Sequence, residues 1–339
     1  MAFDDGLLDD DGALQRADYR LRFLAESGAR VRREASASED ALRDAVTQLS
    51  DSRPRAVVAA GPDSRLLRAV LEPFCPVPFL AWPNPGLPGW AGSLDLVVVL
   101  APEGRDPGTA AAVAEAVRRG CQLVVACPED SPVARHAAGR YSTIFPAESG
   151  DQLATAVVML ELLDRLTLGP PTDPDVVADA LDAVAVDCGP ARDLATNPAK
   201  ILAIGIAETN PLIWGGTVLA ARAARRTAES IRRATGRTAL AADAEHLLPV
   251  LEQTPPADVF ADPFADEADD ARPSLLILDD GSLDDDVRET RDRLVRAAEQ
   301  HGVRVETISS EADGDVARYA ALLATGQYAA AYLEIGTIN

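Results

Sequence analysis

Short apolar runs alternate with longer amphipathic stretches along the chain, and this pattern predicts alternating strands and helices. The clearest run, Leu96-Val97-Val98-Val99-Leu100, is apolar at every position, as expected of a strand buried on both faces of a parallel sheet. The first half is predicted to hold strands at residues 56–60, 78–81, 94–100, 122–126 and 142–145, and helices at 64–71, 109–119 and 131–138. This order is typical of a doubly wound, flavodoxin-like α/β domain, in which helices cover both faces of a parallel sheet.

The second half repeats this architecture without obvious sequence identity to the first. Before it come a long apolar helix predicted at 152–166, a Gly169-Pro170-Pro171 turn and a helix at 174–184. Its predicted helices are 198–207, 216–235, 243–252, 283–301 and 312–325, and its predicted strands are 211–214, 238–240, 274–278 and 304–307. The chain therefore contains two α/β domains with the same plan.

Three segments follow from these predictions. Residues 1–36 form an N-terminal helical segment, residues 37–185 a first domain and residues 186–339 a second domain. Two amphipathic helices are predicted near the start, at 18–34 and 39–49. The stretch 255–272 is rich in proline, alanine and acidic residues, and is interpreted as a mobile surface insertion.

The charge of the chain excludes some partners. A net charge of −22 over 339 residues argues against binding to nucleic acid or to an anionic membrane, because both need a basic surface. The N-terminus lacks the pattern of a secretory signal and no apolar run approaches spanning length, so a cytoplasmic protein is expected. The four cysteines and three histidines lack metal-ligand spacing, which predicts neither a metal site nor a cofactor.

The turn after the strand at 94–100 is the first candidate ligand loop. It reads Ala101-Pro102-Glu103-Gly104-Arg105-Asp106 and lies where an open α/β sheet binds its ligand. In many proteins such a turn, with the helix N-terminus behind it, holds a phosphate. Here Glu103 and Asp106 would repel that anion.

Several motifs, in order along the chain, resemble those of the bacterial dual-specificity phosphoglucose/phosphomannose isomerases, which are double SIS-domain (sugar isomerase) proteins. The motifs are Asn197-Pro198-Ala199-Lys200, Pro211-Leu212-Ile213-Trp214-Gly215, a long helix with Arg226, Val316-Ala317-Arg318-Tyr319-Ala320 and Ala331-Tyr332-Leu333. The resemblance implies two SIS-type domains, a sugar phosphate or related ligand, and a homodimer formed through the apolar helices at 152–166 and 216–235. It also marks the chain as a divergent member.

The resemblance implies substrate-binding positions in two loops. Gly61 and Ser64 correspond to the family's first glycine-rich loop, and Gly104 and Thr109 to its phosphate loop. The family's phosphate-binding hydroxyls are replaced by Ala101, Glu103 and Asp106. An alternative interpretation makes Ser64 a plain N-cap of the helix that follows it. An arginine expected in the family falls on Gln152 or Leu153.

Fewer of the family's catalytic residues have a counterpart in this sequence. The ring-opening histidine of the family aligns with His246, beside Glu245, while its base position falls on Arg233, with Glu229 one turn earlier. Its terminal catalytic lysine has no counterpart, and the only lysine, Lys200, belongs to the Asn-Pro-Ala-Lys motif.

These losses leave three hypotheses. The favoured one is a non-catalytic SIS-fold protein that binds a sugar-related ligand or a partner and has a regulatory role. The second is an active aldose-ketose isomerase that interconverts glucose 6-phosphate or mannose 6-phosphate with fructose 6-phosphate. It would use Glu229 or Glu245 together with His246, with Arg226, Arg233 or Arg105 on the phosphate. The third is a scaffold without a small ligand. An acidic loop facing the site would favour an uncharged or cationic ligand, or a phosphosugar bridged by a divalent cation.

Overall fold

The computed structural model describes residues 2–51, 53–255 and 272–337. The chain forms two compact units, one of residues Ser27–Asp179 and one of residues Met1–Glu26 with Ala180–Asn339. We call them the first and the second domain. The predicted boundaries at 36 and 185 fall inside helices α3 (Ser27–Leu49) and α8 (Pro174–Cys188). The predicted acid-rich insertion lies, except for its two end residues, outside the described residues.

The first domain is built on a parallel five-stranded sheet with the order β2-β1-β3-β4-β5. Its strands are β1 (Val57–Ala60), β2 (Phe79–Trp82), β3 (Leu96–Leu100), β4 (Gln122–Cys127) and β5 (Ser142–Pro146). Its other helices are α4 (Ser64–Leu71), α5 (Pro107–Arg119), α6 (Pro132–His136) and α7 (Gln152–Arg165). This is the flavodoxin-like order, so the predicted fold class is confirmed.

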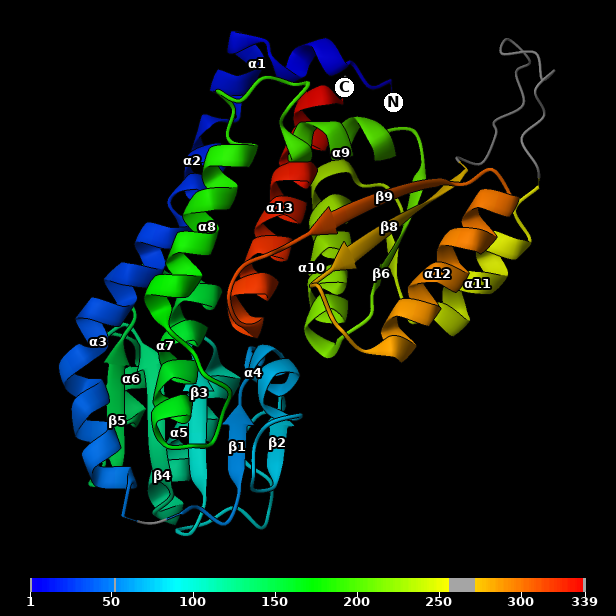
Figure 1. Cartoon of the computed structure of the whole chain (residues 1–339). Helices are drawn as coiled ribbons and strands as arrows, with labels where there is room; N and C mark the ends of the chain where they lie inside the picture. The colour runs from blue at the N-terminus through cyan, green and yellow to red at the C-terminus, as the bar shows by residue number, and fades with distance from the viewer. Residues whose placement is uncertain (1, 52, 256–271, 338–339) are drawn as a thin grey trace. The chain divides into compact units, whose positions relative to one another are not determined.

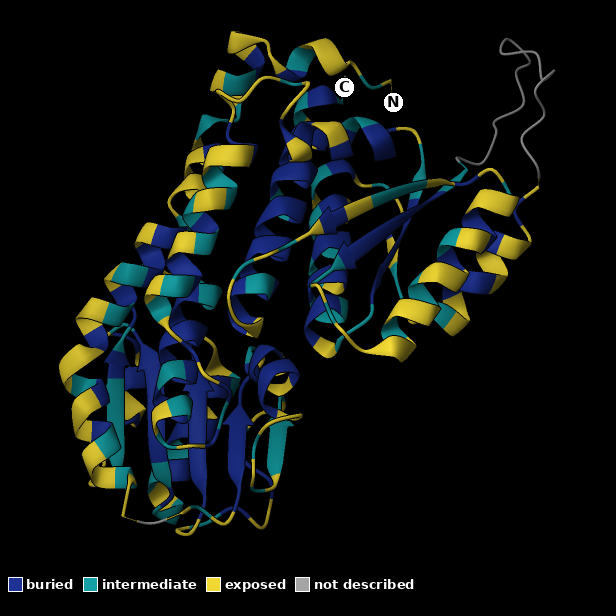
Figure 2. Ribbon diagram, in the orientation of Figure 1, coloured by how far each residue is buried: buried dark blue, intermediate teal, exposed yellow. Residues whose placement is uncertain are grey.

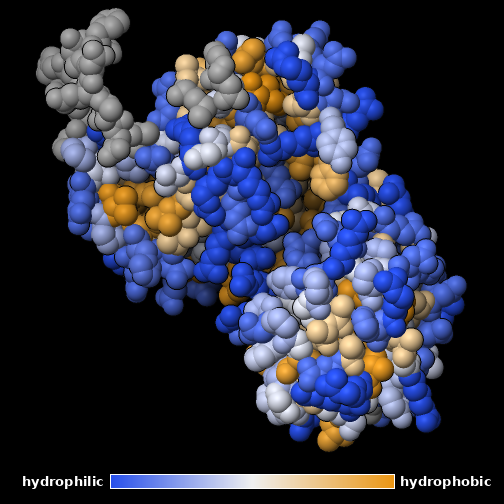
Figure 3. Space-filling view, turned by 180° about the vertical axis from the view of Figure 1, so that it is seen from behind, coloured by the Kyte–Doolittle hydropathy of each residue, from blue (hydrophilic) through white to orange (hydrophobic). Residues whose placement is uncertain are grey.

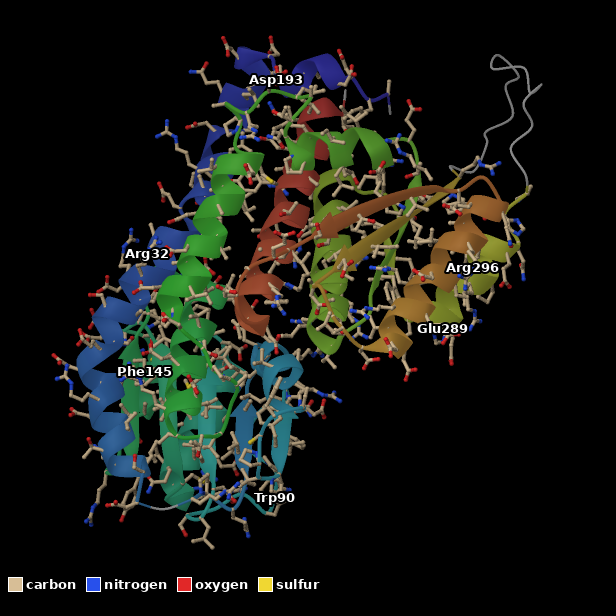
Figure 4. All side chains as sticks on the ribbon, in the orientation of Figure 1. Arg32, Trp90, Phe145, Asp193, Glu289 and Arg296 are labelled. Carbon is tan, nitrogen blue, oxygen red and sulfur yellow. The ribbon has the colours of Figure 1, made fainter. Side chains whose placement is uncertain are left out.

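Both faces of this sheet are buried. Alternate residues of β1, β3 and β4, such as Val58, Val97 and Leu123, form one core cluster with apolar residues of α5 and α6. On the other face, α3 packs against α7 and β5. Figure 2 shows the central strands as buried throughout, and Phe145 of β5, labelled in Figure 4, is wholly buried.

The second domain is built on a parallel four-stranded sheet with the order β7-β6-β8-β9. Its strands are β6 (Asn210–Gly215), β7 (Leu240–Ala241), β8 (Pro273–Asp279) and β9 (Arg304–Ser309). Its helices are η1 (Asp5–Leu8), α1 (Asp11–Arg16), α2 (Asp18–Ala25), α9 (Pro198–Ile206), α10 (Val218–Thr235), α11 (Ala244–Glu252), α12 (Asp285–Gln300) and α13 (Asp315–Gly336). In Figure 1, α11 and α12 cover one face of this sheet, and α9, α10 and α13 the other.

Some predicted element bounds were wrong. The predicted break between helices at residues 34 and 39 is absent: α2 ends at Ala25 and α3 runs on from Ser27 to Leu49. Contacts of α3 with α7 and β5 support the helix across Ala35-Ser36-Ala37-Ser38, a stretch of modest helix propensity. The last helix continues eleven residues past the predicted end at Thr325, to Gly336, because Tyr328, Ala329 and Tyr332 are buried in the core.

No helix within the described ranges has the length and apolarity needed to cross a lipid bilayer.

Candidate functional site

The candidate site lies at the carboxyl ends of β1 and β3 in the first domain. The chain runs from β1 to β2 on one side of this point and from β3 to β4 on the other, which makes it the topological switch point of the sheet. Open α/β sheets bind ligands at such points. The loops that meet there, residues 61–63 and 101–106, are those singled out from the sequence.

Gly61 and Thr109, two of the predicted ligand-binding residues, lie side by side. Gly61 has a φ of +91°, and a Cβ on it would lie 2.9 Å from the Thr109 hydroxyl. The Gly61 N–H donates to the Trp82 carbonyl at 3.0 Å, which ties this loop to the end of β2. Glycine is required here both by the backbone conformation and by the close approach.

Ser64 opens α4 but does not cap it. The cap position is Asp63, which makes no side-chain cap hydrogen bond, so the N-cap interpretation of Ser64 is wrong. The Ser64 side chain is buried, and its hydroxyl has no hydrogen-bond partner within the described residues. The indole N–H of Trp82 is likewise buried without a partner there. Two neutral donors near this edge of the sheet are therefore buried without a hydrogen-bond partner within the described residues.

Asp106 occupies the N-terminus of α5. Its Oδ2 accepts hydrogen bonds from the Thr109 N–H and the Thr109 hydroxyl, each at 2.7 Å. These are the donors that a bound phosphate would use at a helix N-terminus. A carboxylate of the chain itself thus takes the place of an external anion.

Gly104 connects this loop to α6. It has a φ of +64°, a Cβ on it would lie 2.3 Å from the Ser131 Cβ, and its carbonyl accepts from Val133 N–H at 3.3 Å. Its contacts are therefore with the start of α6, which accounts for a glycine at this position.

Gln152 is one of the two positions, with Leu153, on which the arginine expected in the family falls. Its side-chain amide donates to Asp63 Oδ1 at 2.5 Å, across 89 residues of sequence. The pair holds the first residues of α7 against the loop after β1. An amide at this place can bind a hydroxyl group but supplies no positive charge.

The surroundings of the two loops are acidic. An open hollow of about 790 Å³ lies beside the loops after β3, β4 and β5. Its lining includes the four acids Glu103, Glu129, Asp130 and Glu148 and one cation, Arg105. The field in this hollow disfavours a phosphate dianion. The described residues contain no group of three or more His, Cys, Asp or Glu side chains arranged to hold a metal.

The candidate catalytic residues lie on two faces of the second sheet. Glu229 on α10 accepts from Arg226 at 2.7 Å and lies 3.9 Å from Arg233, so these three predicted residues form one charge cluster. His246 and Glu245 are exposed in the first turn of α11, which packs with α12 on the opposite face. The structure therefore does not bring Glu229 and His246 of one chain together.

Sequence reasoning missed two residues beside this charge cluster. Tyr319 of α13 is buried, and burial raises the pKa of its hydroxyl, which hydrogen-bonds with Arg222. Arg222 precedes Arg226 by one helical turn, and this spacing on α10 was the available signal.

The chain was compared with known proteins. Residues 195–336 match the family model described as the bacterial phospho-glucose isomerase C-terminal SIS domain. No curated protein matches the chain in sequence.

Solved structures resemble the whole chain. The tagatose-6-phosphate ketose/aldose isomerase of Escherichia coli has a TM-score of 0.65 at 13% identity, with 91% of this chain and 90% of that chain covered. The C-terminal domain of glucosamine-fructose-6-phosphate aminotransferase from Francisella tularensis has 0.63 at 12%, covering 94% and 96%. A glucose-6-phosphate isomerase like protein from Thermus thermophilus has 0.52 at 16%, covering 84% and 82%. At these identities the likeness shows the fold, two parallel α/β domains as expected, and the family model identifies residues 195–336 as an SIS domain.

Proposed function

We propose that this chain, a divergent member of the bacterial phosphoglucose/phosphomannose isomerase family, is a non-catalytic protein that binds an uncharged or cationic sugar-related ligand at the switch point of its first domain. Such a protein would serve as a sensor or regulator of sugar metabolism. The observation that carries the proposal is the Asp106 carboxylate on the N-terminus of α5, where a sugar phosphate would bind.

Neutral hydroxyl groups fit the remaining groups at the site. The carboxylates of Asp63, Glu103 and Asp106 can accept hydrogen bonds from the hydroxyls of a sugar. The Ser64 hydroxyl and the Trp82 indole N–H, both buried without a partner within the described residues, would donate to the oxygens of a ligand once the loop moves to admit it. An amino sugar would add an attraction to the same carboxylates. A phosphate would meet several negative charges and one arginine, Arg105.

The arrangement of residues in the second domain supports the proposal that the protein does not catalyse isomerisation. Isomerisation needs a base at the substrate carbons together with an acid for ring opening. Glu229 is engaged by Arg226 and Arg233, and His246 lies across the sheet from it. A single copy of the chain therefore does not assemble these two groups.

We further propose a homodimer, as the family resemblance implies. The predicted contact through α7 needs revision, because Ala154 to Leu160 are all buried within the chain and α7 exposes few apolar side chains. Light scattering after gel filtration tests the assembly, and a mass of twice 35.7 kDa is expected. A mass equal to one chain would refute the dimer.

Titration calorimetry tests the ligand class. We compare the affinities of three unphosphorylated sugars, glucose, mannose and glucosamine, with those of glucose 6-phosphate, mannose 6-phosphate and fructose 6-phosphate. A coupled isomerase assay then measures turnover of the sugar phosphates. We expect a free or amino sugar to bind more tightly than the phosphorylated sugars, with no turnover. Ser64→Ala is the matched site variant, since it removes the buried hydroxyl without adding side-chain volume.

Each result that contradicts the proposal refutes a different part of it. Turnover of any sugar phosphate would establish the alternative, an active isomerase, and Glu229, Glu245 and His246 would then be replaced in turn. Tighter binding of the phosphorylated sugars without turnover would refute the ligand class but not the loss of catalysis. Failure of all six sugars to bind would refute the sugar-binding proposal.

A further inference from the structure

A second cavity opens at the other edge of the first sheet, and the geometry points to a binding site there for a small amphiphilic anion, with an apolar body and an acidic head group. The cavity has a volume of about 570 Å³ and lies where β1, β3 and β4 begin. Strands of this length separate it from the switch point by roughly 15 Å. The inference therefore does not depend on the function proposed for the switch point.

Five leucines supply much of the apolar wall of the cavity. Leu49 at the end of α3, Leu94 and Leu96 around the start of β3, and Leu166 and Leu168 after α7 all line it. Leu94 is 68% exposed, an unfavourable position for a large aliphatic side chain unless something covers it. Figure 3 shows hydrophobic side chains among hydrophilic ones at this lower end of the domain, the end where Figure 4 labels Trp90.

The charged residues that line the cavity are both arginines. Arg53, in the segment before β1, is exposed and uses one Nη to donate to the Pro76 carbonyl at 3.1 Å. Arg165, at the end of α7, pairs with Glu161 at 2.5 Å and is half-exposed. No carboxylate is among the described lining residues, although the chain has a net charge of −22 and the hollow at the opposite edge has four acids. The local sign of charge is therefore reversed here.

Thr167 adds an independent observation. It has a φ of +56°, the one non-glycine residue with positive φ in the described ranges, and it is one of the residues that line the cavity. Its N–H bonds to the Asp164 carbonyl and the Leu168 N–H to the Leu163 carbonyl, which is the helix ending that normally uses glycine. A β-branched residue is strained at this place, and strain of this kind gathers at binding sites.

These features fit one chemical class. A cavity of this size is typical of small-molecule sites, the leucines take an apolar body, and the two guanidinium groups take a carboxylate, sulfonate or phosphate at the rim. The hydroxyls of Ser93 and Thr167 can donate to the same head group, whereas the Ser50 hydroxyl already donates to the Val46 carbonyl at 2.5 Å.

Calorimetry with decanoate, below its micelle concentration, tests the site on the full chain. Decyltrimethylammonium has the same alkyl chain with the opposite charge, and acetate has the head group alone. We expect decanoate to bind at least tenfold more tightly than either. The net negative charge of the protein favours the cation everywhere else, so this order of affinity can come only from a local basic site.

Two pairs of variants locate the binding. Leu94→Gln and Arg53→Gln should each weaken decanoate binding at least fivefold. Leu283→Gln replaces a leucine that is 79% exposed in the second domain, and Arg140→Gln removes an exposed arginine near the start of β5, outside the cavity lining. These two controls should leave binding unchanged. All four positions are exposed, so the variants are expected to fold, and circular dichroism checks this.

The inference is overturned if decanoate does not bind, if decyltrimethylammonium binds as tightly, or if all four variants bind like the wild type. None of these results depends on whether a sugar binds at the switch point.

Discussion

Replacement of Asp106 separates the two roles of one carboxylate, as a helix cap and as a charge that repels phosphate. Its Oδ2 accepts from the Thr109 N–H and hydroxyl, each at 2.7 Å. Asp106→Ala removes both the cap and the charge. Asp106→Ser removes the charge and keeps a side-chain oxygen that can cap α5.

The expected stabilities follow from these contacts. Loss of an N-cap costs about 1 kcal/mol. Thr109 is 1% exposed, so its hydroxyl, left without an acceptor, adds about 1–3 kcal/mol. Asp106→Ala should therefore lower the free energy of unfolding by about 2–4 kcal/mol, and Asp106→Ser by about 1 kcal/mol or less. Urea denaturation followed by circular dichroism measures both.

The expected change in affinity has the opposite sign. A phosphate about 4 Å from this carboxylate is repelled by about 4 kcal/mol for each pair of unit charges near a protein surface. Asp106 is exposed, so screening reduces this to about 1–2 kcal/mol, or roughly tenfold in affinity. Both variants should bind glucose 6-phosphate roughly tenfold more tightly than the wild type in calorimetry, and adding Glu103→Ser should increase the gain.

Asp243→Ser is the matched control, because Asp243 holds the N-cap position of α11 without a side-chain cap hydrogen bond. It should change neither stability nor affinity by a measurable amount. Unchanged affinity for glucose 6-phosphate in both Asp106 variants would show that the acidic loop is not the barrier to phosphate. Wild-type stability of Asp106→Ala would refute the capping role.

Three further predictions concern stability. Glu34 is 1% exposed and accepts hydrogen bonds from the Glu148 and Ser149 N–H groups and from the Ser149 hydroxyl. Glu34→Gln should therefore lower the free energy of unfolding by about 2–3 kcal/mol in urea denaturation, whereas Glu39→Gln, at an exposed position, should leave it almost unchanged. Burial raises the pKa of the Cys188 thiol to about 12, so unfolding releases its proton between pH 9 and 12 and stability falls as pH rises in that window. Under reducing conditions the fall from pH 9 to pH 10 should be smaller in Cys188→Ala, and equal slopes would contradict the burial argument. Thr167→Asn should raise stability by about 0.5–1 kcal/mol, because asparagine tolerates positive φ, and a loss would show that the threonine is not strained.

Much of the fold could be predicted because its cause is local. The apolar strands, the amphipathic helices and their alternation follow from periodicity, and they gave the two parallel sheets. The bounds failed in α3 and in the last turns of α13. The local sequence there is compatible with helix, and tertiary contacts, such as those of α3 with α7 and β5, decided how far each helix runs. The helix cap at Asp106 also follows from local sequence, because an aspartate three residues before Thr109 is a common start of a helix. The role predicted for this carboxylate is only the repulsion of a phosphate, and not that of a cap.

By itself the sequence determined the class of fold, the order of the elements and the presence of acids where a phosphate loop would lie, because each depends on neighbours along the chain. Only the tertiary structure decided which side chains share a site. Gln152 meets Asp63 across 89 residues, and Glu34 receives the loop at Ser149 across 115. Glu229 and His246, close in sequence, lie on opposite faces of one sheet. The chain moves one way along the sheet from β6 to β7 and the other way from β7 to β8, so right-handed crossovers place α10 and α11 on different faces. Such long-range contacts produce no periodic pattern in the sequence, because they depend on how the helices and sheets pack against one another in the folded chain.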